Sequence, residues 1–239
     1  GHVETGATAA ALALDVAGVN IIGVGWGALR PKINFSATAG TMVVTGANCT
    51  VQNVLFTGGI DAVVNALQVQ AADFGLFNCE YRDVTGQITL FCLTTAAADR
   101  LTVKNFFYNG AVAAGTATAF ALVGGDGALF DGIEADGDFS TAFLDIRTTA
   151  CTNLRCRNWV ARTRNSADVI GIDTITGSTG VIGPNLNLTI ADNAANFATA
   201  FQGATFVYHN PVSIVNLAGE IGGIAPYNQA GFKTNSTNA

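Results

Sequence analysis

Three acidic side chains stand close together in the segment IEADGDFS: Glu134, Asp136 and Asp138. Because alternate residues of a β-strand point to the same face, a strand here would let the three carboxylates converge. Converging carboxylates bind calcium or act as general acid and base in glycan cleavage. Gly137 fits a solvated turn equally well, so three interpretations stay open: a turn, a cation site and a catalytic site.

The only concentration of basic residues is formed by Arg155, Arg157, Arg162 and Arg164. Arg155 and Arg157 are two residues apart, so a strand would project both from the same face, outside the core and flanking Trp159. The segment is either a solvated face or a docking surface for an acidic partner or subunit. Capture of a sugar or a phosphate is a third use of the same residues.

Other motifs of catalysis and cofactor binding are weak. Gly23, Gly25 and Gly27 superficially suggest a phosphate loop, but neither a helix nor the acidic residue of a βαβ unit follows, so we interpret them as turn glycines. His2 and His209 have no partner at nucleophile or metal spacing. We therefore expect no cofactor, no metal and no enzyme activity.

The chain contains five cysteines, an odd number without metal-ligand spacing. We expect small buried apolar residues and assembly in a reducing cytoplasm. They are Cys49, Cys79, Cys92, Cys151 and Cys156.

A repeat positions all of these residues. An inner Asn or Asp returns after 25, 27, 26, 27 and 27 residues, and a second Asn, Asp or Gly precedes each copy by five or six residues. Such residues suit tight turns, because their side chains bond to nearby backbone and tolerate left-handed conformations, and stacked amides can form ladders. The inner turn residues are Asn53, Asn78, Asn105, Asp131, Asn158 and Asn185; the upstream ones are Asn48, Asp73, Asp99, Asp126, Asn153 and Gly180.

A fixed period in this range is typical of a solenoid. Each unit is rich in Val, Ile, Thr and Phe, alternates with period two, and is interrupted by Gly, Asn and Asp. The sequence therefore predicts an all-β fold, a right-handed, single-stranded parallel β-helix of about eight coils with a period of about 26 residues. The hand follows from the usual right-handedness of parallel crossovers.

We expect one β-helix domain over residues 1–206. Residues 207–239 are predicted to form a C-terminal strand and an extended, non-helical tail, held by a neighbouring subunit through Tyr227 and Phe232. Because the sequence begins with Gly1, we expect a processed or partial chain with an upstream segment.

The composition favours a large core together with a subunit interface. Of 239 residues, 49% are hydrophobic and 12% are charged, and the mean hydropathy is +0.38. Large apolar patches usually mark association sites. No apolar run reaches the length of a membrane helix, and a net charge of −6 argues against direct nucleic-acid binding.

The coil pattern from about residue 7 to residue 183 resembles the pectate-lyase-like superfamily of right-handed parallel β-helices. The chain has no Gly-His-Gly of polygalacturonases, and residues 134–138 contain no lysine or arginine. A closer likeness is to β-helix proteins of tailed bacteriophages. It is carried by the opening GHVET, by ALDVAGVNIIGVGWGALRP at residues 13–31 and by NCEYRD at residues 78–83. This resemblance implies a virion component of the head or the tail.

We therefore expect a structural virion protein that decorates or cements a phage capsid. It would form a homo-oligomer, a trimer, and contact the major capsid protein or other virion proteins, without direct contact with nucleic acid or membrane. It would lie on the particle surface after assembly in the host cytoplasm. The alternative is a tailspike-type receptor binder or glycan depolymerase, with a groove lined by Glu134, Asp136, Asp138, Trp159 and Tyr108. A third candidate is a cellular β-helix adhesin.

Overall fold

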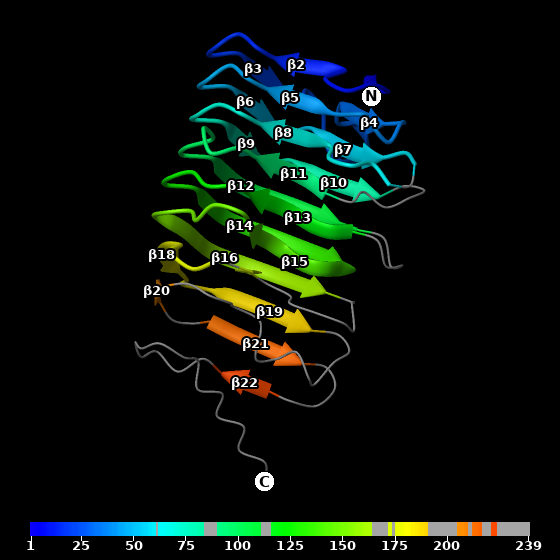
Figure 1. Ribbon diagram of the computed structural model, residues 1–239. Coiled ribbons are helices and arrows are strands. Elements are labelled where there is room, and N and C mark those ends of the chain that lie inside the picture. Colours follow the sequence, from blue (N-terminus) through cyan, green and yellow to red (C-terminus); the bar gives the residue numbers. More distant parts are fainter. Residues whose placement is uncertain are drawn as a thin grey trace.

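The protein is a parallel β-solenoid, which confirms the fold class expected from the repeat. The computed structural model describes residues 1–60, 62–83, 90–110, 116–163, 172–173, 175–190, 205–209, 212–216 and 221–223. In Figure 1 the strands stack one above another, with the N-terminus at the top. There are about six turns with a period of about 26 residues, slightly fewer than the predicted eight. The right hand of the coil stays a prediction.

One face of the solenoid is a seven-stranded sheet in which each strand lies one turn further along the chain. Pairing is parallel throughout, and Met42, Leu67 and Cys92 follow one another at intervals of 25 residues. Seven strands at this spacing are separated by six turns. In order the strands are β2 (Leu12–Leu14), β5 (Met42–Val44), β8 (Leu67–Val69), β11 (Leu90–Thr94), β13 (Thr116–Leu122), β15 (Phe139–Ile146) and β17 (Ile172–Asp173).

The other two faces belong to a fifteen-stranded sheet. Early turns contribute a short strand and then a longer one, whereas in the middle turns the two merge into one bent strand. The separate pairs are β3 (Asn20–Ile22) and β4 (Lys32–Phe35), β6 (Thr50–Gln52) and β7 (Leu55–Gly58), and β9 (Gly75–Phe77) and β10 (Glu80–Asp83). The bent strands are β12 (Thr102–Asn109), β14 (Leu129–Gly137) and β16 (Leu154–Thr163). The sheet begins with β1 (Val3–Gly6) and ends with β18 (Thr179–Ile182), β19 (Leu186–Ile190), β20 (Thr205–Tyr208), β21 (Val212–Asn216) and β22 (Ile221–Gly223).

The bends coincide with residues in the left-handed region. Asn53, with φ 54°, separates β6 from β7, and Asn105, with φ 51°, bends β12. Asn78, Asn158 and Asn185 also have positive φ, as expected for turn residues that bond locally. These five positions confirm the inner row of the predicted repeat.

Asp131 is the exception, and the prediction was wrong by one residue. The left-handed residue of that turn is Gly132, with φ 70°. Glycine takes this conformation without the penalty of a Cβ atom, so Asp131 remains in the extended part of β14. Two positions of the upstream row are displaced in the same way, from Asp99 to Arg100 and from Asp126 to Gly127, whereas Asn48, Asp73 and Asn153 have positive φ as predicted.

Side chains of the inner row bond from turn to turn. The Asn105 Nδ2 donates to Asn78 Oδ1 at 3.1 Å, and Asn185 Nδ2 donates to Asn158 Oδ1 at 3.0 Å. Where Gly132 has no side chain, Asp131 Oδ1 accepts from Asn158 Nδ2 at 2.7 Å. We call this row the amide ladder, and it confirms the stacking expected from the repeat.

The interior is a stack of aromatic rings. The Phe120 ring packs between those of Phe91 and Phe130, with centroid distances of 5.5 and 5.2 Å, and all three side chains are fully buried. The five cysteines are also buried, as predicted, and none forms a disulfide. Burial raises the pKa of the Cys79 and Cys151 thiols to about 12, so neither ionises at neutral pH.

Parallel pairing continues past the domain boundary predicted after residue 206. That boundary falls inside β20, which pairs with β18, and β21 adds to β19 in the same parallel sense. Among the described strands, only β22 changes direction and pairs with β21 in antiparallel fashion. Tyr227 and Phe232 lie outside the described residues.

Candidate functional site

The structure does not bring the predicted groove residues together. Glu134 and Asp136 lie on the outer side of β14, as alternation requires, but Asp138 is 8% exposed at the junction of β14 and β15. The side chains of Tyr108 and Trp159 are buried in the core. A ligand on the outer face of β14 would therefore meet neither ring.

The prediction that Trp159 lines an outer groove is wrong for a local reason. Arg155 and Arg157 point outward, and simple alternation would place Trp159 outward as well. The left-handed residue Asn158 interrupts the alternation, so the next side chain turns inward. The indole Nε1 of Trp159 donates to the Phe130 carbonyl oxygen at 3.2 Å, and a wholly buried ring is not part of a docking surface.

The arginines themselves are exposed, as the sequence indicated. Arg157 donates from Nε and Nη2 to Asp131 Oδ2, at 3.0 and 2.8 Å. Burial raises the pKa of the Asp131 carboxyl, but hydrogen bonds from Asn158 and Arg157 outweigh that effect and hold the pKa below its usual range. Arg155 and Arg162 are exposed on the same strand, whereas Arg164 lies outside the described residues.

A different candidate site arises where the repeat is interrupted. Ile22 is level with Gln52, and Lys32 is level with Leu55. The first turn therefore uses nine residues, 23–31, at a corner where the next turn uses two. We call these nine residues the corner loop. It contains the 3₁₀ helix η1 (Gly27–Leu29), the only helix in the described part of the chain.

Asn53 holds the start of the corner loop. Its Nδ2 donates to the carbonyl oxygens of Gly23 and Gly25, at 2.8 and 2.9 Å. A Cβ atom on Gly23 would stand 2.1 Å from the Asn53 carbonyl oxygen, so only glycine permits this approach. The three glycines thus serve the loop, which agrees with their interpretation as turn residues.

The end of the corner loop is held by an ion pair that crosses a whole turn. Arg30 donates from Nη2 to Glu80 Oε2, and Arg82 donates from Nε to Glu80 Oε1 at 2.9 Å. The Glu80 side chain is 7% exposed, and that of Arg30 is 14% exposed. Breaking one partner of such a buried pair leaves an uncompensated charge, so the loop is fixed at both ends.

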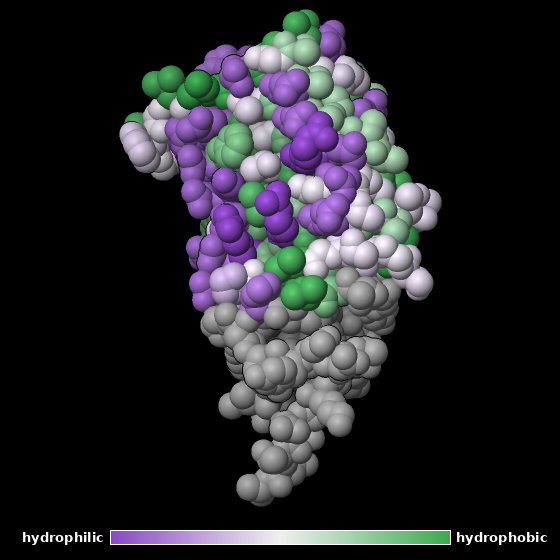
Figure 2. All heavy atoms as spheres, turned by 90° about the vertical axis from the view of Figure 1, so that its left-hand side faces the viewer, coloured by the Kyte–Doolittle hydropathy of each residue, from purple (hydrophilic) through white to green (hydrophobic). Residues whose placement is uncertain are grey.

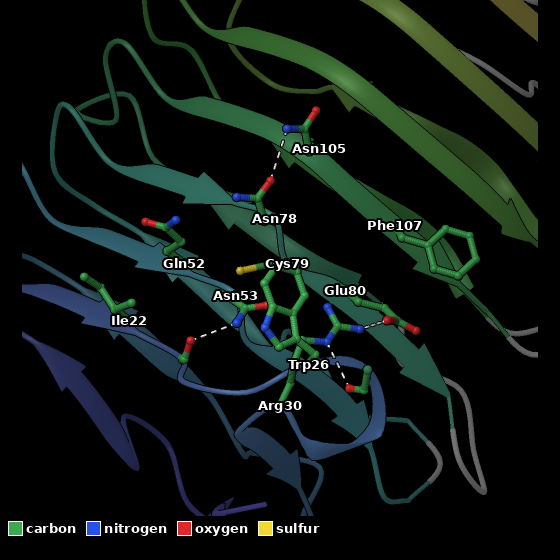
Figure 3. A pocket seen from close by; sticks show the side chains of 12 residues that line it. Ile22, Trp26, Arg30, Gln52, Asn53, Asn78, Cys79, Glu80, Asn105 and Phe107 are labelled. Carbon is green, nitrogen blue, oxygen red and sulfur yellow. Dashed lines mark hydrogen bonds and ion pairs between the residues drawn. The ribbon is translucent and has the colours of Figure 1, made fainter.

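Between the corner loop and the amide ladder lies an open groove of about 540 Å³. Figure 3 shows the Trp26 indole over the middle of the groove, with Asn78 and Asn105 bonded to each other beyond it. Trp26 is 88% exposed. The groove is lined by Ile22, Gly23, Trp26, Gly27 and Arg30 of the first turn, by Gln52 and Asn53, by Asn78, Cys79 and Glu80, and by Asn105 and Phe107.

Our sequence interpretation missed this groove because it assigned Gly23, Gly25 and Gly27 to a turn without recognising an inserted loop. The insertion is visible in the sequence separation of residues that are level in successive turns. Asn20 and its partner Thr50 are 30 residues apart, whereas Lys32 and its partner Leu55 are 23 apart. A long interval followed by a short one identifies an insertion at one corner.

The described residues contain no group of three or more His, Cys, Asp or Glu side chains placed to hold a metal ion. No helix in this part of the chain is long and apolar enough to cross a membrane. Comparison of the chain with protein-family models, curated proteins and solved structures finds no match.

Proposed function

We propose that the protein is a structural component of tailed-bacteriophage particles that decorates or cements the capsid. It acts as a homo-oligomer, a trimer, and contacts the major capsid protein or another virion protein through the N-terminal end of the solenoid. The virion assignment is supported by the likeness of residues 13–31 to phage β-helix proteins. These residues form part of the same N-terminal end.

The observation that carries the proposal is the position of the exposed hydrophobic residues. Val3, Val16, Val24 and Leu29 all belong to the first turn and are at least half exposed. Among the described residues, Val64, Val160 and Val207 are the large hydrophobic residues of later turns that are exposed to a similar degree. Figure 2 shows hydrophobic residues at the upper end of the molecule beside hydrophilic ones, and further hydrophobic residues lower on the same face. Exposed apolar side chains that gather at one end favour association with another protein surface. We call Val3, Val16, Val24 and Leu29 the apolar end.

The rest of the solenoid suits a rigid attachment. Its interior is continuous from turn to turn, and the amide ladder and the Arg157–Asp131 pair tie the outside of successive turns together. Because a solenoid fold serves many functions, the fold alone would not select this one. The apolar end supplies the site-level argument.

The test uses particles that lack the protein. We expect the purified chain to have the native mass of a trimer and to rebind depleted capsids, with density at regular positions on the head in images of intact particles. The double variant V16S/V24S should lower occupancy at least tenfold. Val64→Ser is the matched control, because Val16 and Val64 are both 62% exposed but only Val16 belongs to the apolar end.

Two results would contradict the proposal. A chain that stays monomeric and fails to bind depleted capsids is not a decoration protein. Density confined to the tail tip would also refute decoration, and would favour the receptor-binding alternative.

A further inference from the structure

We propose that the groove between the corner loop and the amide ladder binds a neutral carbohydrate chain. The Trp26 ring stacks on the apolar face of a sugar ring, and amide side chains of successive turns bond to its hydroxyl groups. This activity goes beyond assembly and does not rest on the proposed function, because it uses Trp26, Asn78 and Asn105 rather than Val16 and Val24 of the apolar end.

The exposure of Trp26 is the first argument. Tryptophan is highly buried on average, yet this indole is 88% exposed on a loop fixed at both ends. A large flat ring with an apolar surface is suited to recognition, and the CH face of a pyranose ring is flat and apolar as well. Ile22, which is 63% exposed, and Phe107 extend the apolar lining.

The amide ladder supplies matching polar groups. An Asn side chain has two N–H donors and a carbonyl oxygen with two lone pairs. The bond from Asn105 to Asn78 uses one N–H donor of Asn105 and one lone pair of the Asn78 oxygen. The N–H donors of Asn78 and the carbonyl oxygen of Asn105 remain able to bond to a ligand. A sugar hydroxyl can both donate and accept, so it can bond to both kinds of group.

The spacing of the ladder also fits a chain of sugars. Successive turns of the solenoid lie about 4.8 Å apart, which is comparable with the length of one pyranose unit. Gln52, Asn78 and Asn105 come from three successive turns and line the same groove. A saccharide lying along the solenoid axis would therefore meet a side-chain amide at each of these three turns, from Gln52 beside the ladder and from Asn78 and Asn105 within it.

The charge of the groove favours a neutral ligand. Its two charged lining residues, Arg30 and Glu80, are bonded to each other and largely buried. The whole chain carries a net charge of −6, which disfavours the approach of phosphate, nucleotide or acidic polysaccharide. Because both ends of the corner loop are already held, binding would order little additional structure.

The experiment exploits the two tryptophans of the chain. Trp26 is exposed and Trp159 is buried, so acrylamide should quench the fluorescence of Trp26 selectively. We would add maltohexaose, cellohexaose or chitohexaose to the full chain and measure the quenching. At least one of these neutral probes should protect Trp26 in a saturable manner, while hexagalacturonic acid should not.

Variants then locate the site by calorimetry with the protective hexaose. Trp26→Ala should lower the affinity at least tenfold, and the matched control Val24→Ser should leave it unchanged, since Val24 is 86% exposed on the same loop. Asn78→Gly and Asn105→Gly, which keep the left-handed backbone, should lower the affinity several-fold. Asn185→Gly, in the same ladder but away from the groove, is their control.

The outcomes are decisive in both directions. Failure of all three neutral probes to protect Trp26, protection by the acidic probe alone, or equal losses in W26A and V24S would overturn the proposal. Loss of capsid binding in V16S/V24S with unchanged sugar affinity would leave it standing, because the two activities use different residues.

Discussion

The corner that follows β3 and the corners that follow β6 and β9 occupy the same place in their turns but are built differently. The later two use a left-handed asparagine, Asn53 or Asn78, and one further residue. The first uses the nine residues of the corner loop. The regular corners repeat one conformational solution, whereas the interrupted corner exposes an indole over a groove. The regular turns therefore hold the fold together, and the interruption exposes side chains to solvent.

The largest expected effect tests whether stability resides in the regular turns. The Phe120 ring lies among those of Phe91, Phe106, Phe130 and Phe143. Phe120→Ala would leave a cavity in this stack and should lower the free energy of unfolding by about 3–5 kcal/mol. Denaturant unfolding followed by circular dichroism would measure it. A loss below about 1 kcal/mol would show that the aromatic stack is not the main source of stability.

A smaller effect is expected at a regular corner. Asn158→Ala would put a Cβ-bearing residue without a polar group in the left-handed region and break the bonds to Asp131 and Asn185. We expect a loss of about 2 kcal/mol from backbone strain and hydrogen bonding together. Asn158→Gly separates the two causes, because it removes only the bonds. Equal losses in both variants would mean that the backbone conformation costs nothing there.

Acid should weaken the regular turns. Hydrogen bonds from Asn158 and Arg157 hold the pKa of Asp131 below its usual range despite burial, and a hydrogen bond from Arg100 lowers that of Asp73. A carboxyl with a depressed folded pKa stabilises the fold above the unfolded pKa, about 3.9, and the contribution disappears as the pH falls through the folded pKa. The melting temperature should therefore decrease when the pH is lowered below about 4.

The variant Asp131→Asn isolates this effect. It should melt slightly lower than the wild type at pH 7 and lose less on acidification, with a difference of less than about 1 kcal/mol for a partly exposed pair. Asp15→Asn, at an exposed position in the first turn, is the control. Parallel pH profiles of D131N and the wild type would count against the assignment.

The smallest effect is expected on the corner loop. Val24→Ser and Trp26→Ala replace side chains that are 86% and 88% exposed, so each should change the free energy of unfolding by less than about 0.5 kcal/mol. Differential scanning calorimetry would measure the change. A loss as large as that of N158A would show that the corner loop is part of the folded core, and would erase the contrast between the two kinds of corner.

Much of the fold could be predicted because the left-handed corners accept few residue types. Asparagine and glycine tolerate positive φ, so Asn53, Asn78, Asn105, Asn158 and Asn185 reveal both the period and the bends. The pattern failed at Asp131 because glycine, which carries no polar signal, took the corner at the next position. A shift by one residue leaves the predicted period almost unchanged, but it makes the predicted conformation of Asp131 wrong.

The candidate site was harder to predict. Alternation of side chains gave the outward arginines correctly, but a left-handed residue reverses the alternation, and Trp159 moved into the core for that reason. The groove depends on contacts between turns, such as Arg30 with Glu80, which are 50 residues apart. No local pattern encodes a pair at that separation.

The reversal of β22 has a consequence for growth of the solenoid. A column of parallel strands is open-ended, and each terminal strand offers backbone groups to which another copy could add, turn upon turn, into a fibre. On the column that ends with β21, that edge is occupied by an antiparallel strand, with Ser213 beside Gly223 and Val215 beside Ile221. An incoming copy would meet a strand of opposite polarity, so continued parallel addition stops at this column. A copy added here in the orientation of the preceding turns would have to pair with β22 in antiparallel fashion.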